Sequence, residues 1–226
     1  MSSDPVQTTD IAATFDELAH DRCCKYKSKG LTASTEVLLG LLKENGLVGK
    51  TVLDIGCGTG FFALETLRQG ASSCVGVDLS AAAIQEANEF AKESGLEDRA
   101  RFEVANGAST QHPSSDIVVM DKVLCCYPDA NSLLKTASAS SSELLSFVVP
   151  RDQGLMKPMM RVGIGLINLV ERLRKTGFRL YLHPLRSLDK LLVDNSFRES
   201  SKAKSRFWLV FLYKRTSPDD IGRKMS

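Results

Sequence analysis

The chain has 226 residues, of which 43% are hydrophobic and 25% charged, a balance typical of a globular protein and not of a disordered or membrane-embedded one. Its formal net charge of +2 gives no strong attraction to nucleic acids. The first ten residues are polar, and the most apolar stretch, Val162–Val170, is too short to span a bilayer. We therefore expect a cytoplasmic protein with no membrane span and no nucleic-acid partner.

Two helices are expected ahead of the first strand. Asp10 is a candidate cap for a helix that ends near Asp21, and a basic segment, residues 25–29, follows it. A second apolar periodicity begins near Ser34 and ends at a glycine stop, Gly46. The chain therefore begins with a predicted helical segment that precedes the sheet.

The next segment, residues 52–60, reads VLDIGCGTG and predicts a buried strand that enters a tight glycine loop before a helix. A dinucleotide loop usually has the spacing GxGxxG, whereas here the glycines fall as GxGxG. The carboxylate of Asp54 would repel a pyrophosphate but suits a ligand that carries an ammonium and a sulfonium. The segment therefore favours S-adenosylmethionine, with these candidate binding residues: Asp54, Gly56, Cys57, Gly58 and Gly60.

Strands and helices then alternate as far as residue 150. Strands are expected at residues 51–55, 73–77, 101–105, 116–121 and 144–149, helices after Gly60, after Ser80 and around Leu133–Ala137, and a loop at Ser138–Ser142. Repeated units of this kind with continuous apolar strands predict a parallel sheet that has helices on both faces. Ligands of such sheets bind at the carboxyl ends of the strands.

Asp78 ends the second of these strands, 18 residues after Gly60. An acid in this place can accept hydrogen bonds from both hydroxyls of a ribose, and Leu79 would lie beside the nucleoside. The alternative is a purely structural role, in which Asp78 caps the turn that leads to Ser80.

The last third of the chain departs from simple alternation. Residues 155–173 predict a methionine- and leucine-rich helix, which we interpret as packed on the sheet, with a lid over a large apolar ligand as the alternative. A helix from Ser187 to Val193 follows. A weak strand is expected near Arg198 and a strong one at Phe207–Tyr213.

The DIGCGTG segment resembles motif I of the class I S-adenosylmethionine-dependent methyltransferases. The resemblance implies a Rossmann-like three-layer α/β sandwich, whose mostly parallel seven-stranded sheet ends in an antiparallel C-terminal hairpin. It also implies S-adenosyl-L-homocysteine as product and one domain over residues 1–226. That domain would comprise an N-terminal helical cap (1–46) that closes over the cofactor, a binding core (47–150) and an acceptor-side segment (151–226).

The resemblance also suggests roles for residues after the third and fourth strands. The loop Asn106, Gly107 and Ala108 stands where this class holds adenine. Family members commonly have an acid in the place of Asn106, whose carbonyl could accept the same hydrogen bond; a turn-forming Asn-Gly pair is the alternative. Asp121 would contact the donor or orient the acceptor, or else cap the strand end.

Tyr127 and His183 are the candidates for a catalytic base or an acceptor-orienting group. A base is needed only where the acceptor must lose a proton. Tyr127-Pro128 and Tyr181-Leu182-His183 are similar to the magnesium-protoporphyrin O-methyltransferase branch, which esterifies a porphyrin propionate. The N/D-P-P-Y signature of enzymes that methylate adenine or glutamine amines is absent.

The six cysteines fit neither a disulfide framework nor a zinc site, so reduced thiols and no metal are expected: Cys23, Cys24, Cys57, Cys74, Cys125 and Cys126. The first functional hypothesis is a methyltransferase that methylates a small or lipophilic acceptor at oxygen. The second is a protein that binds S-adenosylmethionine or a nucleoside without catalysis. The third, an NAD-dependent oxidoreductase, is disfavoured by the glycine spacing and by Asp54.

Overall fold

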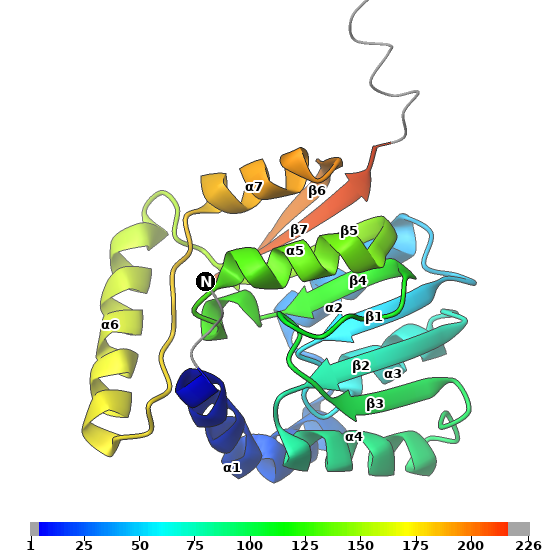
Figure 1. Ribbon diagram of the computed structural model, residues 1–226, viewed down its shortest axis with the longest axis horizontal. Helices are drawn as coiled ribbons and strands as arrows, with labels where there is room; N and C mark the ends of the chain where they lie inside the picture. Colours follow the sequence, from blue (N-terminus) through cyan, green and yellow to red (C-terminus); the bar gives the residue numbers. More distant parts are fainter. Residues whose placement is uncertain (1–4, 217–226) are drawn as a thin grey trace, which may run out of the picture.

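The computed structural model describes residues 5–216, with side chains from residue 8 onward. Seven strands form one sheet in the order β3-β2-β1-β4-β5-β7-β6 (Figure 1). They are β1 (Thr51–Ile55), β2 (Ser73–Asp78), β3 (Ala100–Val104), β4 (Ser115–Asp121), β5 (Ser141–Pro150), β6 (Phe197–Ser205) and β7 (Trp208–Arg215). The first five are parallel, and β7 runs antiparallel to both β5 and β6. The predicted Rossmann-like sheet with its closing hairpin is confirmed.

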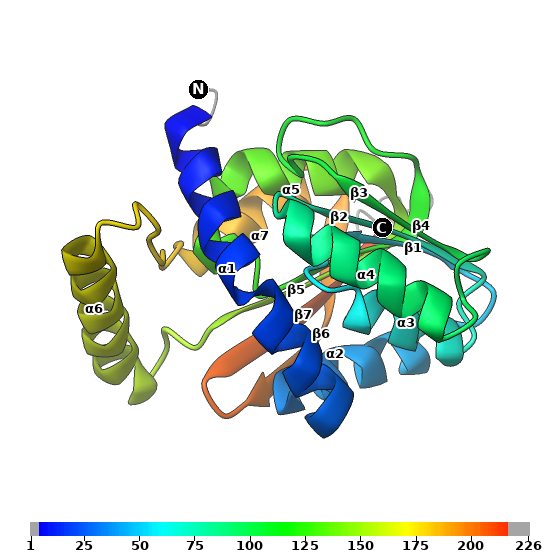
Figure 2. The ribbon, with the colours of Figure 1, turned by 90° about the horizontal axis from the view of Figure 1, so that it is seen from below.

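Helices cover both faces of the sheet and bury two hydrophobic cores (Figure 2). Successive residues of a strand point to opposite faces, so Val52 is buried in one core and Leu53 in the other. The first core is closed by α2 (Ala33–Glu44), α3 (Phe61–Arg68) and α4 (Ala81–Glu93), and the second by α5 (Ala130–Ser140) and α7 (Leu185–Asp194). The predicted cap of α4 is confirmed, because the Ser80 hydroxyl accepts a hydrogen bond from the Ala83 N–H at 3.0 Å.

The first helix, α1 (Pro5–Lys29), is much longer than the predicted Asp10–Asp21. Asp10 lies inside the helix and does not cap it, and the basic segment forms its last turns. Packing explains the difference, because α1 crosses the carboxyl edge of the sheet and runs along α4. Tyr26 stacks on Phe61 with ring centroids 5.1 Å apart. The helix continues until Gly30, whose φ of 71° ends it.

The predicted loop at Ser138–Ser142 is wrong, because α5 runs to Ser140 and β5 begins at the next residue. The buried serines are satisfied locally. The Ser138 hydroxyl donates to the Leu134 carbonyl, and the Ser141 hydroxyl donates to the Leu144 carbonyl, both at 2.7 Å. The guanidinium of Arg215 donates to the backbone carbonyls of both serines. A serine-rich run is therefore compatible with regular structure when its hydroxyls are paired.

The helix predicted at residues 155–173 is present as α6 (Met156–Arg174), but its predicted packing on the sheet is wrong. It stands at one side of the molecule, away from the sheet (Figures 1 and 2). Among its residues only Ile164 is buried, because α5 and α7 already cover the sheet face that it could have used. Within residues 5–216, no helix is long and apolar enough to cross a membrane.

Candidate active site

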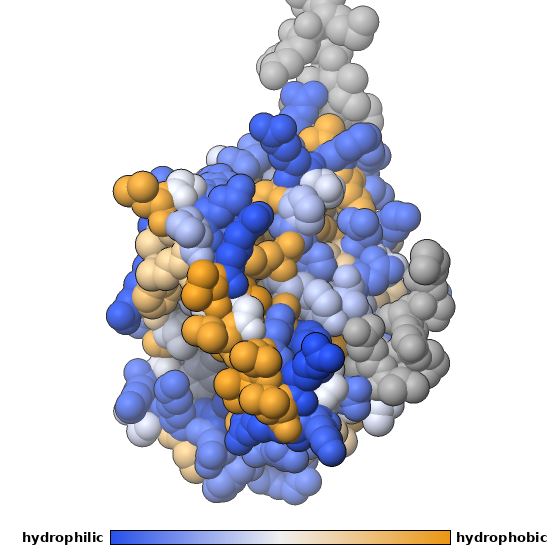
Figure 3. Space-filling view, turned by 90° about the vertical axis from the view of Figure 1, so that its left-hand side faces the viewer, coloured by the Kyte–Doolittle hydropathy of each residue, from blue (hydrophilic) through white to orange (hydrophobic). Residues whose placement is uncertain are grey.

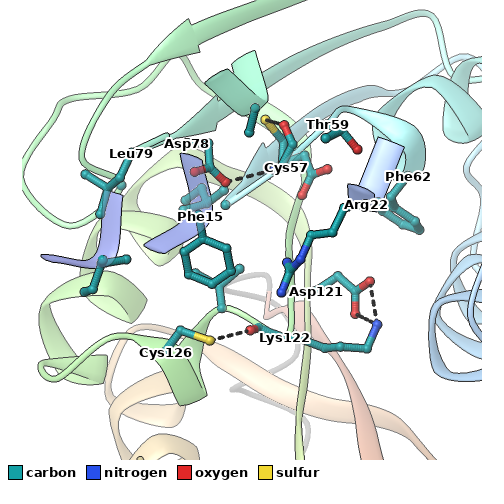
Figure 4. A pocket seen from close by; sticks show the side chains of 18 of the residues that line it. Phe15, Arg22, Cys57, Thr59, Phe62, Asp78, Leu79, Asp121, Lys122 and Cys126 are labelled. Carbon is teal, nitrogen blue, oxygen red and sulfur yellow. Dashed lines mark hydrogen bonds and ion pairs between the residues drawn. The ribbon is translucent and has the colours of Figure 1, made fainter. Parts of the chain in front are cut away.

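A cavity of about 380 Å³ opens at the carboxyl ends of β1, β2 and β4. The order of the sheet reverses between β1 and β4, and such a reversal leaves a crevice beside the ends of the two strands. The glycine loop after β1 lines this cavity, and Phe15 and Arg22 of α1 line it as well (Figure 4). The cavity therefore lies where the strand pattern placed it.

The glycine loop folds back onto the end of β2. The N–H groups of Gly56 and Cys57 both donate to the Val77 carbonyl, at 2.7 and 3.0 Å. Gly56 has a φ of 74°, and a Cβ atom there would lie 2.4 Å from Cγ2 of Val123, so only glycine fits without displacing the chain. The loop thereby brings backbone, with no side chain in between, to the edge of the cavity.

Three carboxylates reach the cavity from three strand ends, and all three were predicted there: Asp54, Asp78 and Asp121. Asp54 is only 1% exposed. Burial raises its pKa well above the ordinary value, and the charges of Asp121 and Asp78 raise it further. Among the residues that the structure describes, no hydrogen bond to its side chain opposes this shift. A cationic ligand would therefore relieve both the burial and the mutual repulsion.

Asp78 also organises the loop itself. One of its oxygens accepts from the Gly58 N–H at 2.8 Å, and the other accepts from the Ser80 N–H at 2.9 Å. Burial nevertheless raises its pKa. The predicted turn-capping role is thus present, and each oxygen keeps a lone pair for a ligand hydroxyl. Leu79 lines the cavity next to it.

The loop after β3 contributes Asn106 and Gly107 to the cavity, whereas Ala108 does not line it. The side-chain carbonyl of Asn106 accepts from the Ala108 N–H at 3.0 Å and from the Tyr127 hydroxyl at 3.1 Å. These two bonds favour the turn-forming alternative for Asn106, because both lone pairs of its carbonyl are in use. Gly107 has no room for a side chain, since a Cβ would lie 2.3 Å from Ile55.

Asp121 belongs to a polar cluster at one end of the cavity. Its carboxylate accepts from the Thr35 hydroxyl at 2.7 Å and from Nζ of Lys122 at 3.0 Å. Lys122 has a φ of 63°, a conformation that is costly for a residue with a side chain. Its Nζ lies 5.7 Å from the centre of the Trp208 ring. The cluster joins β4, α2 and β7 at this wall.

Several cavity residues were missed in the sequence because they come from α1. Phe15, Arg22 and Tyr26 all line the cavity, and the Arg22 guanidinium lies 4.8 Å from the centre of the Phe15 ring. Figure 4 shows Arg22 directed inward, between the glycine loop and Asp121. Thr59 was also missed; its buried hydroxyl has no hydrogen-bond partner within the described chain. A bound ligand would satisfy it.

Besides Ala108, two of the predicted site residues do not reach the cavity. Gly60 immediately precedes α3 and lies against Phe102, which a Cβ would approach to 2.7 Å, so its role is in packing. His183 lies behind the cavity wall, where its Nε2 is 3.0 Å from the Tyr127 backbone carbonyl. Tyr127, by contrast, lines the cavity. The described cysteines are all free thiols, and Cys57, Cys125 and Cys126 lie at the cavity.

Comparisons with known proteins agree with this geometry. A family model described as a methyltransferase domain matches residues 47–217. Magnesium protoporphyrin IX methyltransferase from Synechocystis PCC 6803, solved with bound SAH, has a TM-score of 0.74 at 20% identity, covering 92% of this chain and 99% of that one. Geranyl diphosphate C-methyltransferase from Streptomyces coelicolor A3(2) has a TM-score of 0.71 at 15% identity, covering 96% and 100%.

A similarity to curated proteins is confined to a shorter segment. The ribosomal protein L11 methyltransferase of Alteromonas mediterranea is 43% identical over 70 residues. These residues are 31% of this chain and 24% of that protein. The chain thus matches about a quarter of the length of this relative.

Proposed function

Since the chain belongs to the methyltransferase domain family, we propose that it transfers the methyl group of S-adenosyl-L-methionine to an oxygen atom of a small or lipophilic acceptor. One observation carries this proposal: three carboxylates, of which Asp54 is buried, meet a glycine loop in a largely apolar cavity. When bound, the donor supplies a methyl group on a positively charged sulfur. Buried carboxylates stabilise such a cation, whereas they would repel the pyrophosphate of NAD.

Different residues around the cavity are suited to contact different parts of the donor. We assign the donor's cationic groups to Asp54 and the glycine loop, its ribose hydroxyls to Asp78, and its adenine to the loop at residues 105–107. Arg22 is directed into the cavity and would pair with the donor's carboxylate. Residues 1–46 would then act as a cap, residues 47–150 as the donor-binding core and residues 151–226 as the acceptor side.

The walls that remain for the acceptor are mainly apolar. They come from α1 and from the segment between α6 and α7, and they include Ile11, Leu18, Phe178 and Leu180. These walls support a lipophilic acceptor. No histidine lines the cavity within the described residues, which supports an acceptor that is already deprotonated at neutral pH, such as a carboxylate. Methylation of a carboxylate oxygen needs alignment with the donor but no base.

The proposal is tested first by calorimetric titration with S-adenosylhomocysteine and with NAD. We expect micromolar or tighter binding of the first and none of the second; the reverse result would contradict the proposal. The protein is then incubated with isotope-labelled donor and lipophilic carboxylic acids, phenols and amines, and the products are identified by mass spectrometry. Label on oxygen supports the proposal. Donor binding without product from any acceptor would favour the non-catalytic alternative.

Replacing Tyr127 by phenylalanine distinguishes a positioning role from a catalytic one. Because the hydroxyl donates to Asn106, we expect its loss to weaken donor binding about fivefold, equal to about 1 kcal/mol. The maximal rate should fall by less than tenfold. The matched control is His183→Gln, since His183 lies outside the cavity, and it should leave donor affinity within about twofold. A hundredfold lower rate for Tyr127→Phe, with unchanged donor affinity, would instead identify Tyr127 as the base.

A further inference from the structure

Helix α6 carries a continuous apolar stripe that faces solvent. Its members recur at alternating spacings of four and three residues, which places them on one side of a helix. We call this set the α6 stripe: Leu155, Met159, Val162, Leu166, Leu169 and Leu173. Their exposed fractions range from 48% to 97%. Figure 3 shows the stripe as a band of hydrophobic residues on this face of the molecule.

The opposite side of α6 is held against the protein, which fixes the rotation of the helix. Ile164 is buried there. The side-chain carbonyl of Asn168 accepts from the Leu180 N–H at 2.7 Å, and its amide donates to the Leu180 carbonyl at 2.9 Å. Turning the stripe inward would break both hydrogen bonds and expose Ile164. The stripe therefore faces outward because the structure holds it there.

Basic side chains lie near the α6 stripe, and helical spacing places three of them at its borders: Arg161, Arg172 and Arg174. Residues 155–175 contain five basic residues and one acidic residue, a net charge of +4, whereas the whole chain has +2. The basic residues are all exposed: Lys157, Arg161, Arg172, Arg174 and Lys175. Two of them have acidic neighbours, because Arg161 pairs with Asp152 and Arg174 with Glu171. The face is therefore apolar along its centre and positive around it.

We propose that the α6 stripe docks this protein on the surface of a lipid bilayer that contains anionic headgroups. A helix with one apolar side and basic borders lies in the plane of a membrane interface, where its apolar side enters the acyl boundary and its cations meet the headgroups. The alternating spacing would also suit a second copy of α6. However, a second copy would bring two positive borders together, with Glu171 as the only acid on each helix, whereas anionic lipid complements the charge.

Docking would place the cavity close to the lipid, a consequence that depends on the proposed function. Leu180, which α6 holds through Asn168, lines the cavity, and so does Phe178 from the same segment. A lipophilic acceptor dissolved in the membrane could therefore reach the cavity over a short path. The docking itself requires no activity and can be measured separately.

The test is sedimentation of the full chain with vesicles of phosphatidylcholine alone and of phosphatidylcholine mixed with phosphatidylglycerol. The parent should bind the mixed vesicles and lose this binding as salt increases. Leu166→Glu should weaken binding at least about tenfold, because it places a charge in the stripe. The matched control is Val193→Glu on α7, since Val193 is 52% exposed and Leu166 58%; it should bind like the parent.

A second pair of variants tests the charge. Arg161→Gln/Arg172→Gln should bind mixed vesicles less tightly and with a weaker dependence on salt, whereas Lys43→Gln/Lys92→Gln should not differ from the parent. Unchanged thermal unfolding and donor affinity would show that the variants fold. The proposal is overturned if the parent does not bind mixed vesicles. It is also overturned if sedimentation velocity shows a dimer that Leu166→Glu dissociates while vesicle binding persists.

Discussion

Replacing Asp54 by asparagine is expected to weaken binding of S-adenosyl-L-methionine about 100-fold, equal to about 2.7 kcal/mol. Asp54 is buried beside two other carboxylates, and only burial and their charges shift its pKa. Its carboxylate is therefore available to a cationic ligand. Asparagine keeps the shape of the side chain but removes the charge that would attract the donor. The measurement is isothermal titration of parent and variant at neutral pH.

The same substitution should make the ligand-free protein more stable at neutral pH. Folding raises the pKa of Asp54 above its ordinary value of 3.8. The contribution of this group to the free energy of unfolding is therefore fully present below pH 3.8, and it is lost as the pH rises through the pKa of the folded state. At neutral pH this group thus opposes folding, and asparagine, which does not ionise, removes that penalty. We expect the melting temperature to rise by about 2–4 °C for each kcal/mol gained.

The pH series provides the control for this prediction. The difference in melting temperature between Asp54→Asn and the parent should shrink as the pH falls toward the ordinary value of 3.8, below which the acid is neutral in the folded and the unfolded protein alike. Asp98→Asn, an exposed acid outside the cavity, should change neither stability nor donor affinity. A lower melting temperature for Asp54→Asn at neutral pH, or unchanged donor affinity, would show that the carboxylate serves the fold and not the donor.

Replacing Gly56 by alanine should displace the glycine loop and remove most donor binding. The added Cβ would lie 2.4 and 2.9 Å from the two methyl carbons of Val123, and φ is +74°. Overpacking and left-handed strain each cost about 1–3 kcal/mol, so the free energy of unfolding should fall by about 2–6 kcal/mol. Urea unfolding measures this loss, and titration with S-adenosylhomocysteine should show an affinity at least about tenfold lower.

Two further variants separate the clash from the strain. In Gly56→Ala/Val123→Ala the methyl groups that clash are gone, so part of the stability lost in Gly56→Ala should return. Gly58 has a φ of +53°, but a Cβ added there would have no atom within 4 Å. Gly58→Ala should therefore lower the free energy of unfolding by only about 1 kcal/mol. Equal destabilisation by Gly56→Ala and Gly58→Ala would mean that the contact with Val123 is not what excludes a side chain.

The sheet and three of its acids could be predicted because their signals are local. A buried parallel strand is apolar along its length, and the residue at its end enters the crevice in any sheet of this kind. Asp54, Asp78 and Asp121 follow from that rule and do line the cavity. Asn106 was placed correctly, but its competing hydrogen bonds to Ala108 and Tyr127 depend on a distant side chain and could not be read from the loop.

The α1 residues of the cavity could not be predicted in the same way. Arg22 and Tyr26 lie in a segment whose composition is that of an ordinary solvated helix, and they reach the cavity only because α1 packs along α4. His183 shows the opposite case. Its loop position suggested access to a ligand, but the path of the chain places it behind Tyr127. The path of a loop depends on packing between segments that are far apart in the sequence, so the local sequence pattern does not predict it.

The amino-acid sequence by itself determined where the strands of the core lie in the chain, the glycine loop and the acids at the strand ends, since each depends on neighbours within a few residues. Only the tertiary structure decided what closes the cavity and what remains exposed. The exposed position of α6 shows why packing decides this. Its apolar periodicity is that of a helix packed on a sheet, but α5 and α7 occupy that face, and its stripe is therefore left to solvent.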